Sequence, residues 1–100
     1  MAYTLQLFDD VIQDVAIAKE WYKEQKQGLE EDFANAIENT LALVLKNPKA
    51  YTVRYKKIRI VHPKKFPYNI HFFIDDQEMS VIITAIIHSS RHPKIAKKRI

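Results

Sequence analysis

Residues 59–93, RIVHPKKFPYNIHFFIDDQEMSVIITAIIHSSRHP, decide the fold, because two strand patterns and their connection lie inside this stretch. Residues 68–74 and 79–87 are rich in β-branched and aromatic side chains, which is typical of strands. The polar connection Asp75-Asp76-Gln77 is short enough for a hairpin, so we predict that the two strands pair antiparallel. The second strand is apolar almost throughout, which predicts a central position with both faces covered.

The segments on either side of this pair extend the sheet and end the domain. Residues 54–61 have the pattern of one more strand. The turn 62–67 that follows holds two prolines, which fix φ and discourage a strand from continuing. Residues 91–100 hold five basic side chains and no acidic one, and we expect either a short helix or a tail there.

The first half of the chain has the patterns of one strand and two helices. Tyr3–Leu7 alternates apolar and polar side chains, as a half-buried strand does. We predict a helix from an N-cap at Asp9 or Asp10 to about residue 27, where Gly28 can take the left-handed conformation that ends helices. A second helix is predicted from there to Asn47-Pro48, because proline cannot continue the hydrogen-bond ladder.

Each predicted helix has one apolar face that needs a sheet to cover it. The first face consists of Val11, Val15, Ala18 and Tyr22, and the second of Phe33, Ala36, Ile37, Thr40 and Val44. The chain is therefore predicted to be a single α+β domain over residues 1–100, in the order β-α-α-β-β-β. An N-terminal helical hairpin packs on one face of a small, mostly antiparallel sheet.

Composition excludes several classes of protein. The 100 residues suit one domain, and 47% hydrophobic residues argue against disorder. The chain has no cysteine, which excludes disulfides and thiolate metal sites. No apolar run approaches the length of a membrane span, and the N-terminus lacks a signal-peptide pattern. We expect a cytoplasmic protein that does not enter a membrane.

The net charge of +4 conceals a strong asymmetry between the two halves. Residues 1–45 contain three basic and nine acidic side chains, a net of −6, whereas residues 46–100 contain thirteen basic and three acidic ones, a net of +10. A half this positive favours nucleic acid or an acidic protein surface as partner.

The histidines do not form a metal-ligand pattern, so no metal and no cofactor is predicted. His71 is expected to be a surface or half-buried side chain on the same sheet face as Asn69. Arg59 and Arg91 are expected to converge with Lys57 on a concave face suited to phosphate. Most of the aromatic side chains of the second half are assigned to the core.

An ordered set of short motifs resembles the RelE/ParE superfamily of toxins from type II toxin-antitoxin systems. The matching residues are Trp21-Tyr22, Gly28-Leu29, Phe33, Asn47-Pro48, Arg59, Lys64-Lys65, Phe66-Pro67-Tyr68, Ile74-Asp75, Ala85-Ile86-Ile87-His88, Arg91 and Pro93. The resemblance covers nearly the whole chain. It is closer to ParE than to RelE because of the Phe66-Pro67-Tyr68 pattern, the helical hairpin marked by Trp21-Tyr22 and Gly28-Leu29, and an incomplete set of nuclease residues, since Ile95-Ala96 stands where many relatives carry an aromatic residue.

The resemblance implies a plasmid-stabilisation toxin that inhibits DNA gyrase by binding it and is not an enzyme. It also implies a cognate antitoxin with an acidic C-terminal segment, compatible with a toxin–antitoxin hetero-oligomer. The residues expected to bind the target are Arg59, Lys64, Lys65, His88, Arg91, Lys94, Lys97, Lys98 and Arg99.

Two alternatives stay open at the level of sequence. The first is a RelE-like, metal-independent mRNA endonuclease that acts on the ribosome. In that enzyme Arg59 and Arg91 would clamp the scissile phosphate, with His88 or His92 as proton donor. The second is a nontoxic relative that serves as an interaction module.

Overall fold

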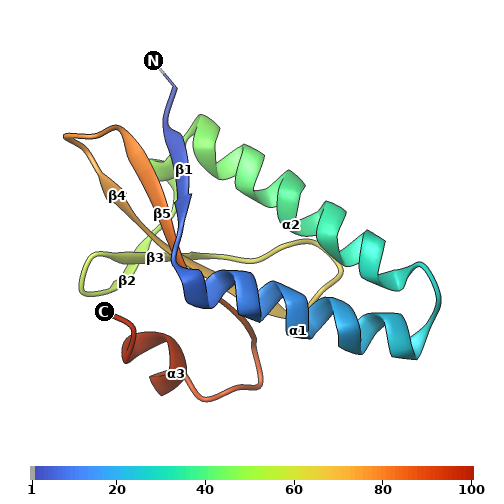
Figure 1. The fold of residues 1–100 in the computed structure, drawn as a ribbon. Coiled ribbons are helices and arrows are strands. Elements are labelled where there is room, and N and C mark those ends of the chain that lie inside the picture. Colours follow the sequence, from blue (N-terminus) through green and yellow to red (C-terminus); the bar gives the residue numbers. More distant parts are fainter. Residues whose placement is uncertain (1) are drawn as a thin grey trace.

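A computed structural model describes residues 2–100 of the protein, which form a sheet with helices on both faces (Figure 1). The elements are β1 (Thr4–Leu7), α1 (Asp9–Gln25), α2 (Leu29–Lys46), the 3-10 turn η1 (Pro48–Ala50), β2 (Val53–Tyr55), β3 (Ile58–Val61), β4 (Tyr68–Asp75), β5 (Ser80–His88) and α3 (Lys94–Lys97). None of these helices is long and apolar enough to span a membrane.

The sheet formed by the described residues has the strand order β1-β5-β4-β3-β2. β1 runs parallel to β5, and the other neighbouring strands are antiparallel. The predicted α+β class and the antiparallel pairing of β4 with β5 are confirmed. β1 is more exposed than a half-buried strand, since all four of its residues are exposed at the edge of the sheet.

The segment predicted as one strand over residues 54–61 forms two strands in the structure. Residues 54–61 were expected to form a single strand, but the chain reverses at Lys56-Lys57 and makes the hairpin of β2 and β3. Lys56 lies in the left-handed region, with φ of 47°. Such two-residue turns usually carry Gly, Asn or Asp at this position, so a lysine gives no sequence signal for the turn.

The helix ends agree in part with the prediction. Phe8, not Asp9 or Asp10, occupies the N-cap of α1, so the predicted cap is wrong and both aspartates lie in the first turn. There they still favour the positive end of the helix dipole. Gly28 has the predicted left-handed conformation, with φ of 90°, but it is the N-cap of α2 and does not end α1, which stops at Gln25 with Lys26 as its C-cap.

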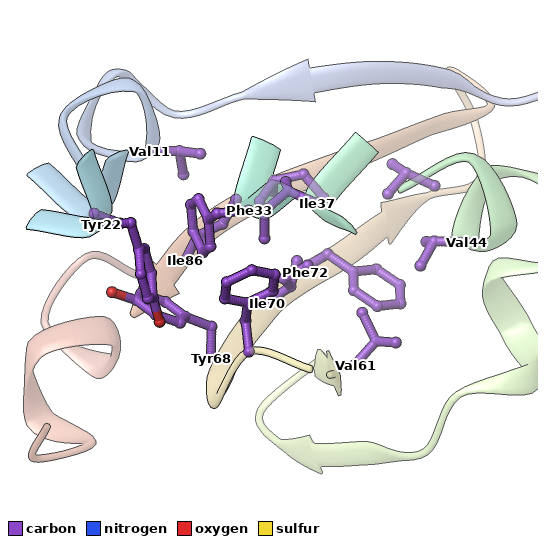
Figure 2. Packing of buried hydrophobic residues seen from close by; sticks show 14 residues of the cluster. Val11, Tyr22, Phe33, Ile37, Val44, Val61, Tyr68, Ile70, Phe72 and Ile86 are labelled. Atoms are coloured by element: carbon purple, nitrogen blue, oxygen red, sulfur yellow. The ribbon is translucent and has the colours of Figure 1, made fainter. Parts of the chain in front are cut away.

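The main core lies between the helical hairpin and one face of the sheet (Figure 2). The predicted helix faces are confirmed, because their central side chains are buried in this core. Phe33 is fully buried, and its ring centroid lies 4.9 Å from that of Tyr68, 5.2 Å from that of Tyr22 and 5.3 Å from that of Phe66. Aromatic packing of this kind holds the 62–67 turn against the helices.

A bulge in β5 lets side chains of this strand pack against the helical hairpin on one face of the sheet and against α3 on the other. The pairing with β4 slips after His71, which is opposite Ala85, while the next residue of β4 is opposite Ile83. Thr84 is therefore the extra residue, and bulges change which face the following side chains occupy. Ile83 and Ile86 join the core under the hairpin, whereas Ala85 packs with Ala96 of α3 on the other face.

Candidate functional site

The helix α3 lies on the side of the sheet away from α2 (Figure 1). On this side there is a cavity of about 300 Å³. We call it the α3 cavity. It is lined by Arg54, Tyr55, Ile60, Asn69, His71, Ile87, Ser89, Arg91, Pro93 and Lys97. The side chains come from β2, β3, β4, the end of β5 and the C-terminal segment, so the cavity exists only in the folded chain.

The charged side chains that line the α3 cavity are all positive. Arg54, Arg91 and Lys97 line it, and none of the described lining residues is Asp or Glu. In residues 2–100 these three cations make no ion pair. The Lys97 Nζ lies 5.3 Å from the centroid of the Tyr55 ring, which holds the ammonium over an aromatic face. The arrangement suits an anionic group.

His71 forms part of the wall of the α3 cavity and is 2% exposed, so the expectation of a surface or half-buried side chain is wrong. Its Nδ1 lies 2.9 Å from the Tyr55 hydroxyl. Burial lowers the pKa of His71 to about 4, and the positive charges of Arg99 and His62 act in the same direction. At neutral pH the imidazole is therefore uncharged.

The structure does not bring Arg59 and Arg91 together. Side chains at paired positions of adjacent strands occupy the same face, and Arg59 pairs with Phe72, which belongs to the core under the hairpin. The Arg59 Nη1 donates hydrogen bonds to the carbonyl oxygens of Tyr51 at 2.6 Å and Lys49 at 3.2 Å. Arg59 thus fastens the segment before β2, while Arg91 lines the cavity on the opposite face.

Lys57 does not join a shared phosphate clamp with these arginines either. Its Nζ lies 4.1 Å from the centroid of the Phe73 ring, and Lys57 is not among the residues that line the α3 cavity. The predicted concave face with Arg59, Arg91 and Lys57 is therefore wrong. Only Arg91 of the three contributes to the cavity.

His88 caps the turn that follows β5. Its Nδ1 accepts hydrogen bonds from the Ser90 amide at 3.0 Å and the Ser90 hydroxyl at 2.7 Å. Its ring packs edge-on against Tyr68, with 5.3 Å between centroids. One ring nitrogen is thus engaged in holding the turn, which is a structural use of this side chain.

A second hollow, which we call the hairpin groove, runs between the helical hairpin and the 62–67 turn and has a volume of about 1030 Å³. Lys64, Lys65 and His88 from the predicted target-binding set line it. Trp21, which is 54% exposed, and Leu43 add apolar surface. The groove therefore combines apolar walls with cations at one side.

Arg99 is a structural residue of the tail and is not free to bind a target. Its guanidinium donates two hydrogen bonds to the Asp14 carboxylate, at 2.6 Å and 2.8 Å, and one to the Thr84 carbonyl at 3.0 Å. The hydrogen bond to Asp14 raises the pKa of Arg99. Asp14 also accepts from the Ile86 amide at 2.9 Å, so one carboxylate joins α1, the bulged strand and the C-terminus.

The other basic residues of the tail point to solvent or to the cavity. Lys94 and Lys98 are exposed, and Lys97 lines the α3 cavity. Tyr55, Asn69 and His71 were not predicted as site residues. For Asn69 and His71 the sequence holds a signal, because polar side chains at alternate positions of the otherwise apolar segment 68–74 require a polar environment on one sheet face. The sequence holds no such signal for Tyr55.

Solved structures with the same fold come from toxin-antitoxin systems. A chain of the chromosomal ParDE system from P. aeruginosa superposes with a TM-score of 0.74 at 11% identity, over 86% of this chain and 95% of that chain. A double-arginine mutant of the E. coli toxin RelE in the free state gives 0.67 at 17% identity, over 100% and 99%. The intact E. coli RelBE complex gives 0.62 at 15%, over 90% and 100%.

The fold is thus that of the RelE/ParE-like toxins, as the motifs of the sequence predicted. The family model for the ParE toxin of the type II toxin-antitoxin system, parDE, matches residues 5–93. The chain belongs to the ParE toxin family. A search of curated proteins gives no significant match.

Proposed function

We propose that this type II toxin acts by binding DNA gyrase and that it does not cut RNA. The observation that carries the proposal is the match to the ParE toxin family over residues 5–93, which includes the helical hairpin and most of the sheet. The resemblance to ParE implies inhibition of gyrase and a plasmid-stabilising role, and the N-terminal sequence, which lacks a signal-peptide pattern, supports a cytoplasmic location.

The geometry of the predicted nuclease residues supports binding over cleavage. A metal-independent ribonuclease needs cations around one phosphate and a proton-transfer group beside it. Arg59 and Arg91 lie on opposite faces of the sheet, and the Nδ1 of His88 is occupied by Ser90. His71, the histidine nearest to the cationic cavity, has a pKa of about 4 and is a weak proton donor at neutral pH because it is uncharged.

The hairpin groove is the surface we assign to the target. Lys64 and Lys65 are exposed along it, and the exposed rings and aliphatic side chains of Trp21 and Leu43 lie in the same hollow. Interfaces combine buried aromatic anchors with charged rims, which is the composition of this groove. Arg91, Lys94 and Lys98 add exposed positive charge from the C-terminal segment.

An antitoxin is the second partner we assign to the chain, because ParE toxins belong to two-component systems. The second half of the sequence carries a net charge of +10, which complements an acidic segment electrostatically. A disordered acidic segment that folds on binding could cover a large part of this surface. The result would be a toxin–antitoxin hetero-oligomer.

A gyrase assay with purified components tests the proposal. The chain should inhibit DNA supercoiling, and the double variant Lys64→Glu, Lys65→Glu should inhibit at least about tenfold less, the size of one lost interfacial hot spot. Lys19→Glu with Lys23→Glu on the exposed side of α1 makes the same change in net charge and should retain inhibition.

Two other measurements separate the alternatives. Induction of the chain without its antitoxin should arrest growth of the bacterial host, and unimpaired growth would instead identify a nontoxic relative. Mapping of mRNA ends on translating ribosomes should reveal no codon-positioned cuts. Cleavage that disappears in an Arg91→Ala variant would overturn the gyrase proposal in favour of an endonuclease.

A further inference from the structure

The two edges of the sheet formed by residues 2–100 differ in how far they resist pairing with another chain. The strand order places β1 at one edge and β2 at the other. β2 is three residues long, its pairing with β3 is irregular, and it contains Arg54, with two lysines directly after it. Short length, irregular pairing and positive charge are features that keep an edge from adding a strand. β1 has no charged residue and no proline, and its pairing with β5 is regular.

The backbone of β1 has unpaired hydrogen-bonding groups along its outer edge. The Thr4 amide donates to the Met79 carbonyl at 2.8 Å, toward β5. Successive residues of a strand direct their N–H and C=O groups to opposite edges, so those of Leu5 and Leu7 point away from β5. Within residues 2–100 these groups have no hydrogen-bond partner, because β1 pairs there with β5 alone. The edge can therefore accept one more strand.

The side chains of Leu5 and Leu7 make this edge apolar. Their partners in β5 are Val81 and Ile83, whose side chains belong to the core under the helical hairpin, so both leucines lie on that side of the sheet. Leu5 is 39% exposed and Leu7 is 43% exposed. An added strand with apolar side chains at the same spacing would cover them.

We propose that two copies of this chain pair antiparallel through their β1 strands, about a twofold axis at Gln6. Leu5 of each copy then lies opposite Leu7 of the other, and each such pair exchanges both of its N–H···O=C hydrogen bonds. The leucine side chains of the two copies meet on the hairpin side of one continuous sheet. The same surface is self-complementary, as a twofold interface requires.

Charge favours a second copy over an acidic antitoxin segment as the occupant of this edge. β1 belongs to the half of the chain with a net charge of −6, and the exposed Asp9 and Asp10 follow it directly. Their carboxylates repel an acidic strand laid along β1. In the twofold arrangement Asp9 comes nearest to Tyr3 of the other copy and Asp10 to Ala2, which carry no charged side chain.

The dimer is expected to be weak, because a strand of four residues covers little surface. Interfaces that bury less than about 1,200 Å² are typical of transient contacts, so we expect a dissociation constant between about 10 μM and 1 mM. Pairing is also independent of gyrase binding, since Leu5 and Leu7 are not among the described residues that line the hairpin groove. Failure of either proposal would leave the other standing.

Sedimentation velocity of the full chain without antitoxin tests the pairing, at protein concentrations from about 10 μM to about 1 mM. The average mass should rise toward that of a dimer. In the same samples, hydrogen exchange measured by NMR should become slower at the Leu5 and Leu7 amides as the concentration rises. A chain that stays monomeric, or that dimerises without protecting these two amides, would overturn the proposal. Protection that requires added antitoxin would assign the edge to the antitoxin instead.

Variants at the two edges separate strand pairing from a general effect of charge. Leu7→Lys should weaken dimerisation at least about tenfold, because it places a charge in the apolar contact. Val53→Lys makes the same change on the edge strand β2, at a residue that is 45% exposed, and should dimerise as the unmodified chain does. Equal losses in these two variants would contradict pairing through β1.

A second variant tests the backbone contribution. Leu5→Pro removes an N–H that points away from β5, so it leaves the pairing of β1 with β5 in place, as proline on an edge strand does. It should abolish dimerisation, and circular dichroism checks that the variant is folded. A folded Leu5→Pro variant that dimerises like the unmodified chain would show that β1 is not the contact.

Discussion

The two faces of the sheet differ in what fills them. Under the helical hairpin, the face is closed by aromatic and aliphatic side chains, among them the fully buried Phe33 and Phe72 (Figure 2). Under α3, a small apolar cluster lies beside a cavity that is lined by the cations Arg54, Arg91 and Lys97. The comparison indicates that the first face provides most of the apolar packing, whereas the second face is polar and positively charged.

The largest expected effect on stability comes from removing a core aromatic ring under the helical hairpin. Phe33→Ala should lower the free energy of unfolding by about 3–5 kcal/mol, because it removes a buried ring and leaves a cavity among three aromatic neighbours. Urea unfolding followed by circular dichroism measures the change. Arg54→Gln on the other face should alter stability by less than about 0.5 kcal/mol, as exposed substitutions do. A comparable loss from both variants would contradict the division between the faces.

The second effect tests how the burial of His71 on the α3 side of the sheet makes stability depend on pH. The folded protein holds His71 neutral, with a pKa of about 4 against 6.5 in the unfolded chain. Between these two values the unfolded state binds more protons, so stability should fall as the pH is lowered from about 6.5 to about 4. The full loss approaches about 3 kcal/mol, and above pH 6.5 the contribution of neutral His71 is complete.

The matched variants for this pH effect are two histidine substitutions. His71→Gln should flatten the stability profile between pH 4 and 6.5, whereas His92→Gln, at an exposed position, should leave it unchanged. Chemical denaturation at several pH values measures both. Identical profiles for the two variants would show that folding does not lower the pKa of His71.

The fold was largely predictable because it follows from side-chain periodicity. The buried side chains of α1 and α2, the left-handed Gly28 and the β4–β5 hairpin each depend on neighbours in sequence. The β2–β3 turn was missed because Lys56 occupies a conformation that lysine rarely adopts. The bulge at Thr84 was missed because an apolar strand gives no sign of where its register slips.

The candidate site was less predictable because it depends on which face each residue occupies. The exposed position of Lys64 and Lys65 agreed with the sequence, but Arg59 and Arg91 were expected together and lie on opposite faces. Arg99 is predicted from the sequence as one more target-binding cation of the tail, but its partner Asp14 is 85 positions away. No local pattern reveals a pair at that separation.

The third effect concerns Asp14, whose carboxylate joins α1 to β5 and to the C-terminal segment. Asp14→Ala should destabilise the protein by about 2–3 kcal/mol, because it leaves Arg99 and the Ile86 amide without their shared acceptor in a largely buried place. A double-mutant cycle with Arg99→Ala should reveal strong coupling, since neither change is independent of the other. Lys98→Ala, an exposed neighbour in the tail, serves as the control. Additive losses would mean that the clamp does not fasten α3 to α1.

The smallest expected effect concerns the turn between β2 and β3, which lies next to the α3 cavity. Lys56→Asn should stabilise the protein by up to about 1 kcal/mol, because asparagine tolerates the φ of 47° better than lysine does. Lys57→Asn in the same turn should have the opposite sign, with a loss of about 0.5 kcal/mol, since it removes the ammonium from the Phe73 ring. Thermal unfolding resolves both changes. If the two variants shift stability in the same direction, the left-handed conformation of Lys56 and the contact of Lys57 with Phe73 do not contribute in the opposite ways expected here.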